Sequence, residues 1–122
     1  MRNNTPKESS EQVALFQWAE RAAGRYPELR LLFHIPNGGS RNAIEAHNLR
    51  LQGVKAGVPD ICLPVPKGGY AALYIELKRK SGGRVSDAQR GWIEALKRAG
   101  NCVLICKGFD EARNTILEYL KG

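Results

Sequence analysis

The chain has 122 residues, a length that suits one domain with one hydrophobic core. Hydrophobic residues make up 43% of it, so a packed interior can form without disulfides or a structural metal, and wholesale disorder is excluded. The 19 Lys and Arg residues outnumber the 12 Asp and Glu residues, for a net charge of +7. That charge favours a polyanionic partner such as nucleic acid, although a soluble surface alone would also account for it.

The sequence does not predict a membrane association or a secreted state. No segment has the length of a membrane span, and the N-terminal residues "MRNNTPKESSEQ" are polar throughout. The three cysteines lie in apolar runs without the spacing of a zinc site. This pattern indicates reduced core residues of a cytoplasmic protein, namely Cys62, Cys102 and Cys106.

The first elements expected along the chain are a helix and a strand. The helix is predicted over "SSEQVALFQWAERAAG", with Ser9 or Ser10 as its N-cap and Gly24 at its end. The apolar run "LRLLFHI" then predicts a strand over Leu29–Ile35, which "PNGGS" breaks.

The middle of the chain predicts a second helix followed by a β-hairpin. The stretch "RNAIEAHNLRLQG" is expected to be helical, with Ser40 as its cap and Gly53 at its end. The stretches "DICLPV" and "AALYIELK" predict two strands joined by a Pro/Gly turn, which together form the hairpin.

The last part of the chain predicts a helix, a strand and a closing helix. Ser86 caps "SDAQRGWIEALKRAG", the apolar run "NCVLICK" predicts a strand at a buried central position, and Asp110 caps "DEARNTILEYL". The order α-β-α-β-β-α-β-α mixes a hairpin with crossover units, so it indicates an α/β domain with a mixed β-sheet flanked by helices. This single domain is expected over residues 9–122, after a polar tail of residues 1–8.

Three charged side chains lie in the apolar hairpin, and strand alternation places two of them together. Glu76 and Lys78 share one face of "LYIELK", about 7 Å apart at their Cα atoms. If "PKGGY" is a five-residue loop, Val65 pairs with Ala71. Asp60 then lies opposite Glu76 on the same face. A four-residue loop would turn Asp60 away, so convergence of the three charges requires an odd loop or a bulge.

Two adjacent carboxylates repel each other and need a compensating cation. A divalent ion such as Mg²⁺ supplies that charge, because it takes one or two carboxylates together with water and phosphate oxygens. Lys78 would then stabilise negative charge that develops at a phosphate, or orient the attacking water. The alternative is an exposed ion pair between Glu76 and Lys78 on a solvated strand, with Asp60 only ending the preceding turn.

Several blocks of the sequence resemble a known nuclease family. Pro59-Asp60 together with "ELK" at residues 76–78 resembles the PD-(D/E)xK nuclease superfamily. More narrowly, "HIPNGG", "GVKAGVPDI", "YIELK" and "SDAQRGWIEALKRAG", in this order, resemble the virus-type replication-repair nuclease (VRR-NUC) domain family. The resemblance runs from about Glu8 to Leu120, which is essentially the whole chain.

The resemblance implies a restriction-endonuclease-like core and Mg²⁺- or Mn²⁺-dependent cleavage of DNA phosphodiester bonds, often in flaps or branched junctions during DNA repair. Compact members occur in phages and bacteria and are similar to Holliday-junction resolvases, which work as homodimers. No small-molecule cofactor or membrane is expected. The implied metal ligands are Asp60, Glu76, the carbonyl of Leu77 and Glu11, and the implied catalytic residues also include Lys78 and Gln89.

Two of these assignments compete with other interpretations. Glu8 is an alternative to Glu11, although Glu11 has the better helical register with Leu15. Glu11 could also be only a first-turn acid that interacts with the helix dipole. Gln89 fits a capping box with Ser86, so it could serve the helix, the reaction or both.

A further group of residues is expected to contact DNA. The "PNGGSRN" junction precedes a helix N-terminus that could hold a phosphate, although an ordinary loop would also explain its glycines. Basic residues flank the hairpin and its exits and fit contacts to backbone phosphates, although each one alone also fits a solvated charge. The candidates are Asn37, Gly38, Ser40, Arg41, Lys55, Lys67, Arg79, Lys80 and Arg84.

Three functions stay open from the sequence alone. One is a metal-dependent nuclease, the second is a non-catalytic nucleic-acid-binding module on a degenerate nuclease fold, and the third is a protein-interaction domain whose basic charge is incidental. The presence of Asp60, Glu76 and Lys78 favours the nuclease. The preferred DNA structure, the dimer interface and the pathway are not determined by the sequence.

Overall fold

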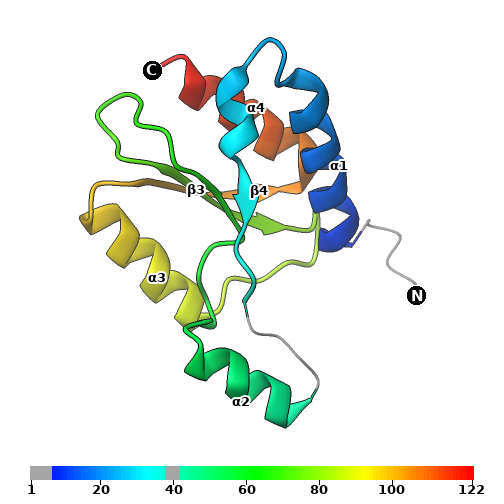
Figure 1. Cartoon of the computed structure of the whole chain (residues 1–122), viewed down its shortest axis with the longest axis vertical. Coiled ribbons are helices and arrows are strands. Elements are labelled where there is room, and N and C mark those ends of the chain that lie inside the picture. Colours follow the sequence, from blue (N-terminus) through cyan, green and yellow to red (C-terminus); the bar gives the residue numbers. More distant parts are fainter. Residues whose placement is uncertain (1–6, 38–41) are drawn as a thin grey trace.

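The computed structural model of the chain describes residues 7–37 and 42–122, and Figure 1 shows how their helices and strands are arranged. The order α-β-α-β-β-α-β-α predicted from the sequence is confirmed, with a 3₁₀ helix, η1, added between α1 and β1. The elements are α1 Glu8–Ala22, η1 Pro27–Leu31, β1 Phe33–His34, α2 Ala43–Leu51, β2 Ile61–Leu63, β3 Leu73–Lys78, α3 Asp87–Arg98, β4 Cys102–Lys107 and α4 Gly108–Leu120.

The strands form one mixed sheet in the order β1-β2-β3-β4. β1 pairs antiparallel with β2, β2 pairs antiparallel with β3, and β3 pairs parallel with β4. The chain passes through α3 between the two parallel strands, because parallel neighbours need a long crossover connection. β3 is therefore a central strand, and all of its residues except Tyr74 are buried.

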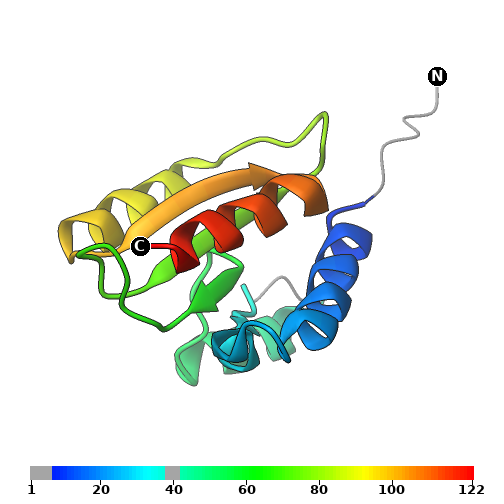
Figure 2. The ribbon, with the colours of Figure 1, turned by 90° about the horizontal axis from the view of Figure 1, so that it is seen from above.

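Helices cover both faces of the sheet. α1 and α4 lie together on one face and α3 lies on the other, as the two perpendicular views show (Figures 1 and 2). Leu73, Ile75 and Leu77 of β3 enter the core that α1 and α4 cover. Since side chains alternate along a strand, Glu76 and Lys78 face the α3 side. None of the helices in the described ranges is long and apolar enough to cross a membrane.

The hairpin of β2 and β3 has the register that places Asp60 opposite Glu76. Ile61 pairs with Ile75 in the antiparallel ladder, and the next position outward on each strand is one of the two acids. Opposed residues of a ladder point to the same face of the sheet. The predicted convergence of the two carboxylates is therefore confirmed.

The turn of the hairpin differs from the predicted five-residue loop. Lys67 pairs with Tyr70 around two glycines, whose φ angles are 59° and 87°. Positive φ at both central residues is what a two-residue type I′ turn requires. Between this turn and the ladder, residues 64–66 on one side face residues 71–72 on the other. The extra residue on the first side shifts the pairing by one position, as a β-bulge does. The shift produces the expected register, with Asp60 opposite Glu76.

β4 is an edge strand of the sheet, so the predicted central position of "NCVLICK" is wrong. Leu104 is 44% exposed and Ile105 is 42% exposed, whereas Val103 and Cys106 are buried. A continuous apolar run indicates that helices or other layers cover both faces of a strand. It does not indicate whether another strand pairs along its edge.

The predicted strand over Leu29–Ile35 is largely replaced by η1, and only Phe33–His34 pair as β1. Pro27 occupies the first position of η1, where its fixed φ suits a helical turn and its missing N–H costs nothing. The turn lets Leu29 enter the core.

Two helices lack the side-chain caps that the sequence predicted. α1 begins at Glu8 and has no side-chain cap, so neither Ser9 nor Ser10 caps it. α4 begins at Gly108, directly after β4, so Asp110 lies in its first turn and is not its cap. At the start of α4, the carboxylate of Glu11 accepts from the backbone N–H of Phe109, and the carboxylate of Glu111 accepts from the backbone N–H of Lys107.

The other two helices have side-chain caps. Asn42 caps α2 through its Oδ1 atom, so the predicted cap Ser40, which lies outside the described residues, is wrong. The capping box of α3 is confirmed, because Ser86 Oγ accepts from the backbone N–H of Gln89 and the Gln89 side chain accepts from the backbone N–H of Ser86.

Candidate active site

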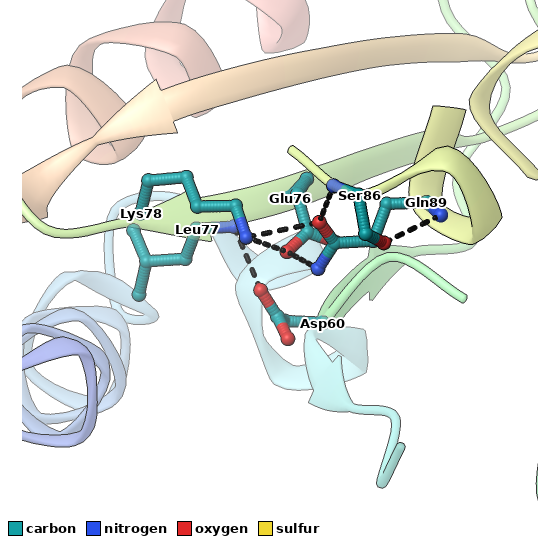
Figure 3. Close-up of polar contacts among 6 residues, drawn as sticks. All are labelled: Asp60, Glu76, Leu77, Lys78, Ser86 and Gln89. Atoms are coloured by element: carbon teal, nitrogen blue, oxygen red, sulfur yellow. Dashed lines mark hydrogen bonds and ion pairs between the residues drawn. The ribbon is translucent and has the colours of Figure 1, made fainter. Parts of the chain in front are cut away.

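Asp60 lies where β2 begins, and both its backbone and its side chain are held. Its carbonyl oxygen accepts a hydrogen bond from the backbone N–H of Ile35 at 2.6 Å, and the same oxygen lies 2.9 Å from His34 Nδ1. Its carboxylate Oδ2 accepts from the backbone N–H of Leu77 at 2.8 Å (Figure 3). β1 and β3 therefore fix the Asp60 carboxylate beside the C-terminal end of β3.

Glu76, Lys78 and Gln89 form one connected group on the α3 side of the sheet (Figure 3). Glu76 Oε2 accepts a hydrogen bond from Gln89 Nε2 at 3.0 Å and lies 3.3 Å from Lys78 Nζ. Lys78 Nζ donates to Gln89 Oε1 at 3.1 Å. Glu76 is 1% exposed and Lys78 is 7% exposed, so the contact between them is buried and the solvated-pair alternative is wrong.

Gln89 serves the helix and the acidic site at once. Its Oε1 atom accepts from the backbone N–H of Ser86 at 2.8 Å, which completes the capping box of α3. The same atom accepts from Lys78, while its Nε2 donates to Glu76. The fixed N-terminus of α3 thus holds the amide in the one orientation that serves both charged partners.

Glu76 lies in surroundings that disfavour its charge. Burial, followed by the negative charge of Asp60, raises the pKa of Glu76 from 4.5 to about 8, against the opposing effect of Lys78. Its Oε1 atom is buried and accepts no hydrogen bond from the described part of the chain. The site therefore presents a carboxyl oxygen with a free acceptor position beside a second carboxylate.

This set of donors fits a hard divalent cation. A cation between Asp60 and Glu76 would offset their repulsion and use the free position at Oε1. In an antiparallel ladder, the N–H and C=O of one residue face the same neighbouring strand, so the carbonyl of Leu77 faces the Asp60 side. Over residues 7–37 and 42–122, no three His, Cys, Asp or Glu side chains are grouped for a metal. Mg²⁺ suits so sparse a set, because it commonly keeps several waters and uses one or two carboxylates.

Glu11 contacts the start of α4 and Lys80. Its buried carboxylate accepts a hydrogen bond from the backbone N–H of Phe109, in the first turn of α4, and lies 4.0 Å from Lys80 Nζ. A Cβ on Gly108 would lie 2.7 Å from Lys80 and 3.0 Å from the Glu11 carboxylate, so a glycine is needed there. Glu11 is buried and Glu8 is exposed. The metal-binding role of Glu11 stays a prediction.

Lys67 is at the wrong end of the hairpin to join the site. It pairs with Tyr70 at the turn, which lies about 20 Å from Glu76 at about 3.3 Å per strand residue. Its Nζ atom lies 3.8 Å from Glu28. The expected cluster around the acids therefore excludes Lys67, and a contact of Lys67 with DNA elsewhere stays a prediction.

The remaining residues predicted to contact DNA divide into three groups. Arg79, Lys80 and Arg84 follow β3 at the end where the acids lie, and Lys55 lies in the segment that leads to Asp60. Asn37 is exposed beyond β1. The structure does not describe the other three, which are Gly38, Ser40 and Arg41.

Two neighbours of the site were missed by the sequence analysis. His34 is exposed in β1, and its ring contacts the carbonyl of Asp60. Trp92 lies one helical turn after Gln89, and Lys55 Nζ is 6.0 Å from its ring centroid. The three-residue spacing from Gln89 is a helical signal that could have found Trp92. The His34 contact depends on the register of a two-residue strand, which carries no such signal.

Both the sequence and the fold are similar to those of one family. The family model described as "VRR-NUC domain" matches residues 4–110. A solved structure described as "VRR_NUC domain protein" is 30% identical to the chain and covers 99% of it and 92% of its own length, with a TM-score of 0.82. Among curated proteins, no sequence matches this chain. The matched residues include Asp60, Glu76, Lys78 and Gln89, and the chain therefore belongs to the VRR-NUC family and carries a nuclease-type domain.

Proposed function

We propose that the chain is an Mg²⁺- or Mn²⁺-dependent endonuclease that hydrolyses phosphodiester bonds in DNA, with branched DNA such as flaps or four-way junctions as its substrate. The observation that carries the proposal is the opposition of Asp60 and Glu76 across the hairpin, with the Lys78 ammonium 3.3 Å from Glu76. Phosphodiester hydrolysis needs stabilisation of negative charge at a phosphate and a positioned water. Two carboxylates beside a buried ammonium support both tasks.

The contacts of each residue support a separate part in the reaction. Asp60, Glu76 and the carbonyl of Leu77 would hold the metal, which when bound supplies Lewis-acid activation of a phosphate oxygen and a water of lowered pKa. Lys78 would donate to a phosphate oxygen as negative charge develops there. Gln89 is a positioning residue, because it orients Glu76 and Lys78 through its two side-chain ends.

The raised pKa of Glu76 couples metal binding to the loss of a proton. With a pKa of about 8, the carboxyl is largely protonated near neutral pH when no cation is present. A carboxyl must lose its proton to become a metal ligand, so metal binding should release a proton and strengthen as the pH rises.

The proposed DNA contacts are to the backbone and to shape. The net charge of +7 and the basic residues that follow β3, Arg79, Lys80 and Arg84, support contacts with phosphates. We propose a homodimer, since resolution of a four-way junction requires a cut in two strands. The place of action would be the cytoplasm of a bacterium or of a phage-infected host cell.

The test is cleavage of labelled linear, flap and four-way-junction DNA, with and without Mg²⁺ or Mn²⁺. Asp60→Asn and Lys78→Met should abolish metal-dependent cleavage while the far-UV circular dichroism keeps its shape. The matched controls Asp110→Asn and Lys121→Met remove exposed charges and should cleave like the wild type. Cleavage by both site variants at the wild-type rate would refute the proposal. Salt-sensitive DNA binding by a wild-type chain that cleaves nothing would indicate a non-catalytic binding module.

Glu11 needs a test of its own. Glu11→Gln keeps an acceptor for the backbone N–H of Phe109 and removes the charge beside Lys80. If Glu11 binds metal, the Mn²⁺ concentration for half-maximal cleavage should rise. If Glu11 only holds the start of α4, that concentration should stay unchanged while the unfolding midpoint falls.

A further inference from the structure

Beside the proposed active site, an aromatic ring and a lysine from two different segments meet. Trp92 lies on α3 and is partly exposed, whereas its neighbour Ile93 is the buried residue of this helix. Lys55 comes from the segment between α2 and β2, and its Nζ atom lies 6.0 Å from the centroid of the Trp92 ring. Residues three apart on a helix are surface neighbours, so the indole lies next to Gln89, whose amide orients the charged pair.

The two segments are held together where Gly57 meets Ala88. A Cβ on Gly57 would lie 2.8 Å from the carbonyl carbon of Ala88, and its φ of +92° also favours glycine. Figure 1 shows the segment between α2 and β2 passing the start of α3. The same segment leads into Asp60. A close-packed backbone thus supports Lys55 beside Trp92 and, a few residues later, an acid of the proposed metal site.

The surface next to the ring is open and apolar. A hollow of about 340 Å³ is lined by Trp92 and by the small residues Ala88, Gly91 and Ala95. Lys55 Nζ lies over the Trp92 ring, and the same ring also lines this hollow. An aromatic ring with an ammonium close by is complementary to a nucleotide, which offers a planar base and an anionic phosphate. An apolar peptide side chain could fill the hollow, but it would supply no anion to Lys55.

We propose that Trp92 and Lys55 bind an unpaired nucleotide of the DNA substrate, with its base stacked on the indole and its phosphate paired with the ammonium. Bases inside a duplex are stacked on one another and offer no face to a side chain, whereas a single-stranded flap contains unpaired nucleotides. The Trp92–Lys55 site therefore selects DNA with an unpaired nucleotide near the phosphate to be cut. The inference rests on the proposed nuclease function, because it places DNA at Asp60 and Glu76.

Indole fluorescence of the full chain tests the stacking directly. The chain has two tryptophans, so Trp18→Phe leaves Trp92 as the only indole, and Asp60→Asn with EDTA prevents cleavage. The probes are an oligothymidylate and an abasic oligonucleotide of the same length, which carries the same phosphates without bases. Stacking predicts quenching by the oligothymidylate and none by the abasic strand. Equal quenching by the two probes, or none by either, would overturn the proposal.

Fluorescence anisotropy of labelled DNA gives a second measurement that keeps Trp18 in place. Trp92→Leu should weaken binding of a flap duplex about five-fold or more and leave a blunt duplex unchanged, and Trp92→Phe should restore most of the flap affinity. Equal losses on both DNAs would overturn the stacking. Lys55→Gln should lower the slope of log affinity against log salt by about one, and an unchanged slope would remove Lys55 from the site.

These measurements distinguish the stacking site from the nuclease reaction. They need no metal, so base-dependent quenching in a chain that fails to cleave would contradict the reaction and support the Trp92–Lys55 site. Cleavage of branched DNA by a chain without that quenching would contradict the site alone.

Discussion

Replacement of Glu76 by glutamine should shift the stability of the metal-free chain in favour of the variant as the pH rises, because glutamine cannot acquire the buried negative charge that Glu76 acquires. The folded-state pKa of Glu76 is raised from 4.5 to about 8, first by burial and then by Asp60. A group whose pKa is raised on folding contributes stability that is complete below its unfolded pKa and is lost as the pH rises through its folded pKa. At about 1.4 kcal/mol per pKa unit, the wild-type chain loses on the order of 5 kcal/mol across this window. Domains commonly have only about 5–15 kcal/mol of stability in total, so the effect is large.

Urea unfolding in EDTA at about pH 5, 7 and 9 measures this effect. The difference in unfolding free energy between Glu76→Gln and the wild type should grow with pH, in favour of the variant. Addition of Mn²⁺ at alkaline pH should stabilise the wild type and leave the variant nearly unchanged, since the cation offsets the buried charge. Glu94→Gln, at an exposed position of α3, is the matched control and should show no such trend. A pH-independent difference for Glu76→Gln would refute the paired-carboxylate reasoning.

Three further predictions concern the supports of the site and the core. Ser86→Ala should cost about 1 kcal/mol of stability and leave kcat unchanged. Gln89→Glu keeps the acceptor for the helix cap but loses the donor to Glu76, so it should lower kcat. Equal kcat values for the two variants at saturating DNA would mean that Gln89 acts only as a cap. Gly57→Ala should lower the free energy of unfolding in urea by about 1–3 kcal/mol more than Gly53→Ala does. Both glycines have positive φ, but only at Gly57 would the new Cβ clash with Ala88. Equal losses of unfolding free energy would contradict the close packing. Tyr119→Phe should cost about 0.5–1.5 kcal/mol, since its hydroxyl donates to the carbonyl of Val65 at 2.5 Å; an unchanged unfolding midpoint would show that water replaces this bond.

The local rules of a strand were enough to predict the centre of the site. Alternation along β3 placed Glu76 and Lys78 together, and the register that opposes Asp60 to Glu76 followed from one condition on the turn. The condition was met by a two-residue turn with an extra residue beside it, which differs from the predicted loop but gives the same parity. Parity depends only on whether a residue count is odd or even, so it survives an error in the turn type.

Features that depend on contacts between distant segments could not be predicted in the same way. The apolar run of β4 gave the right element but the wrong place in the sheet, because burial of its faces and pairing along its edge are separate properties. The start of α4 is held in part by Glu11, far away in the sequence, and the side chain of its N-cap residue, Lys107, makes no capping hydrogen bond. The meeting of Lys55 and Trp92 likewise depends on how a loop lies against α3.

Because β4 is an edge strand, salt should act in opposite directions on self-association of this chain and on its binding of DNA. Each copy carries a net charge of +7, so copies repel one another when the ionic strength is low. Raising salt from physiological levels to about 1 M shortens the screening length from about 8 Å to about 3 Å, which weakens that repulsion while the apolar contacts of Leu104 and Ile105 keep their strength. The same salt releases DNA from the basic surface. An unpaired edge strand invites pairing with a second chain, so DNA binding and self-association should vary in opposite directions with ionic strength.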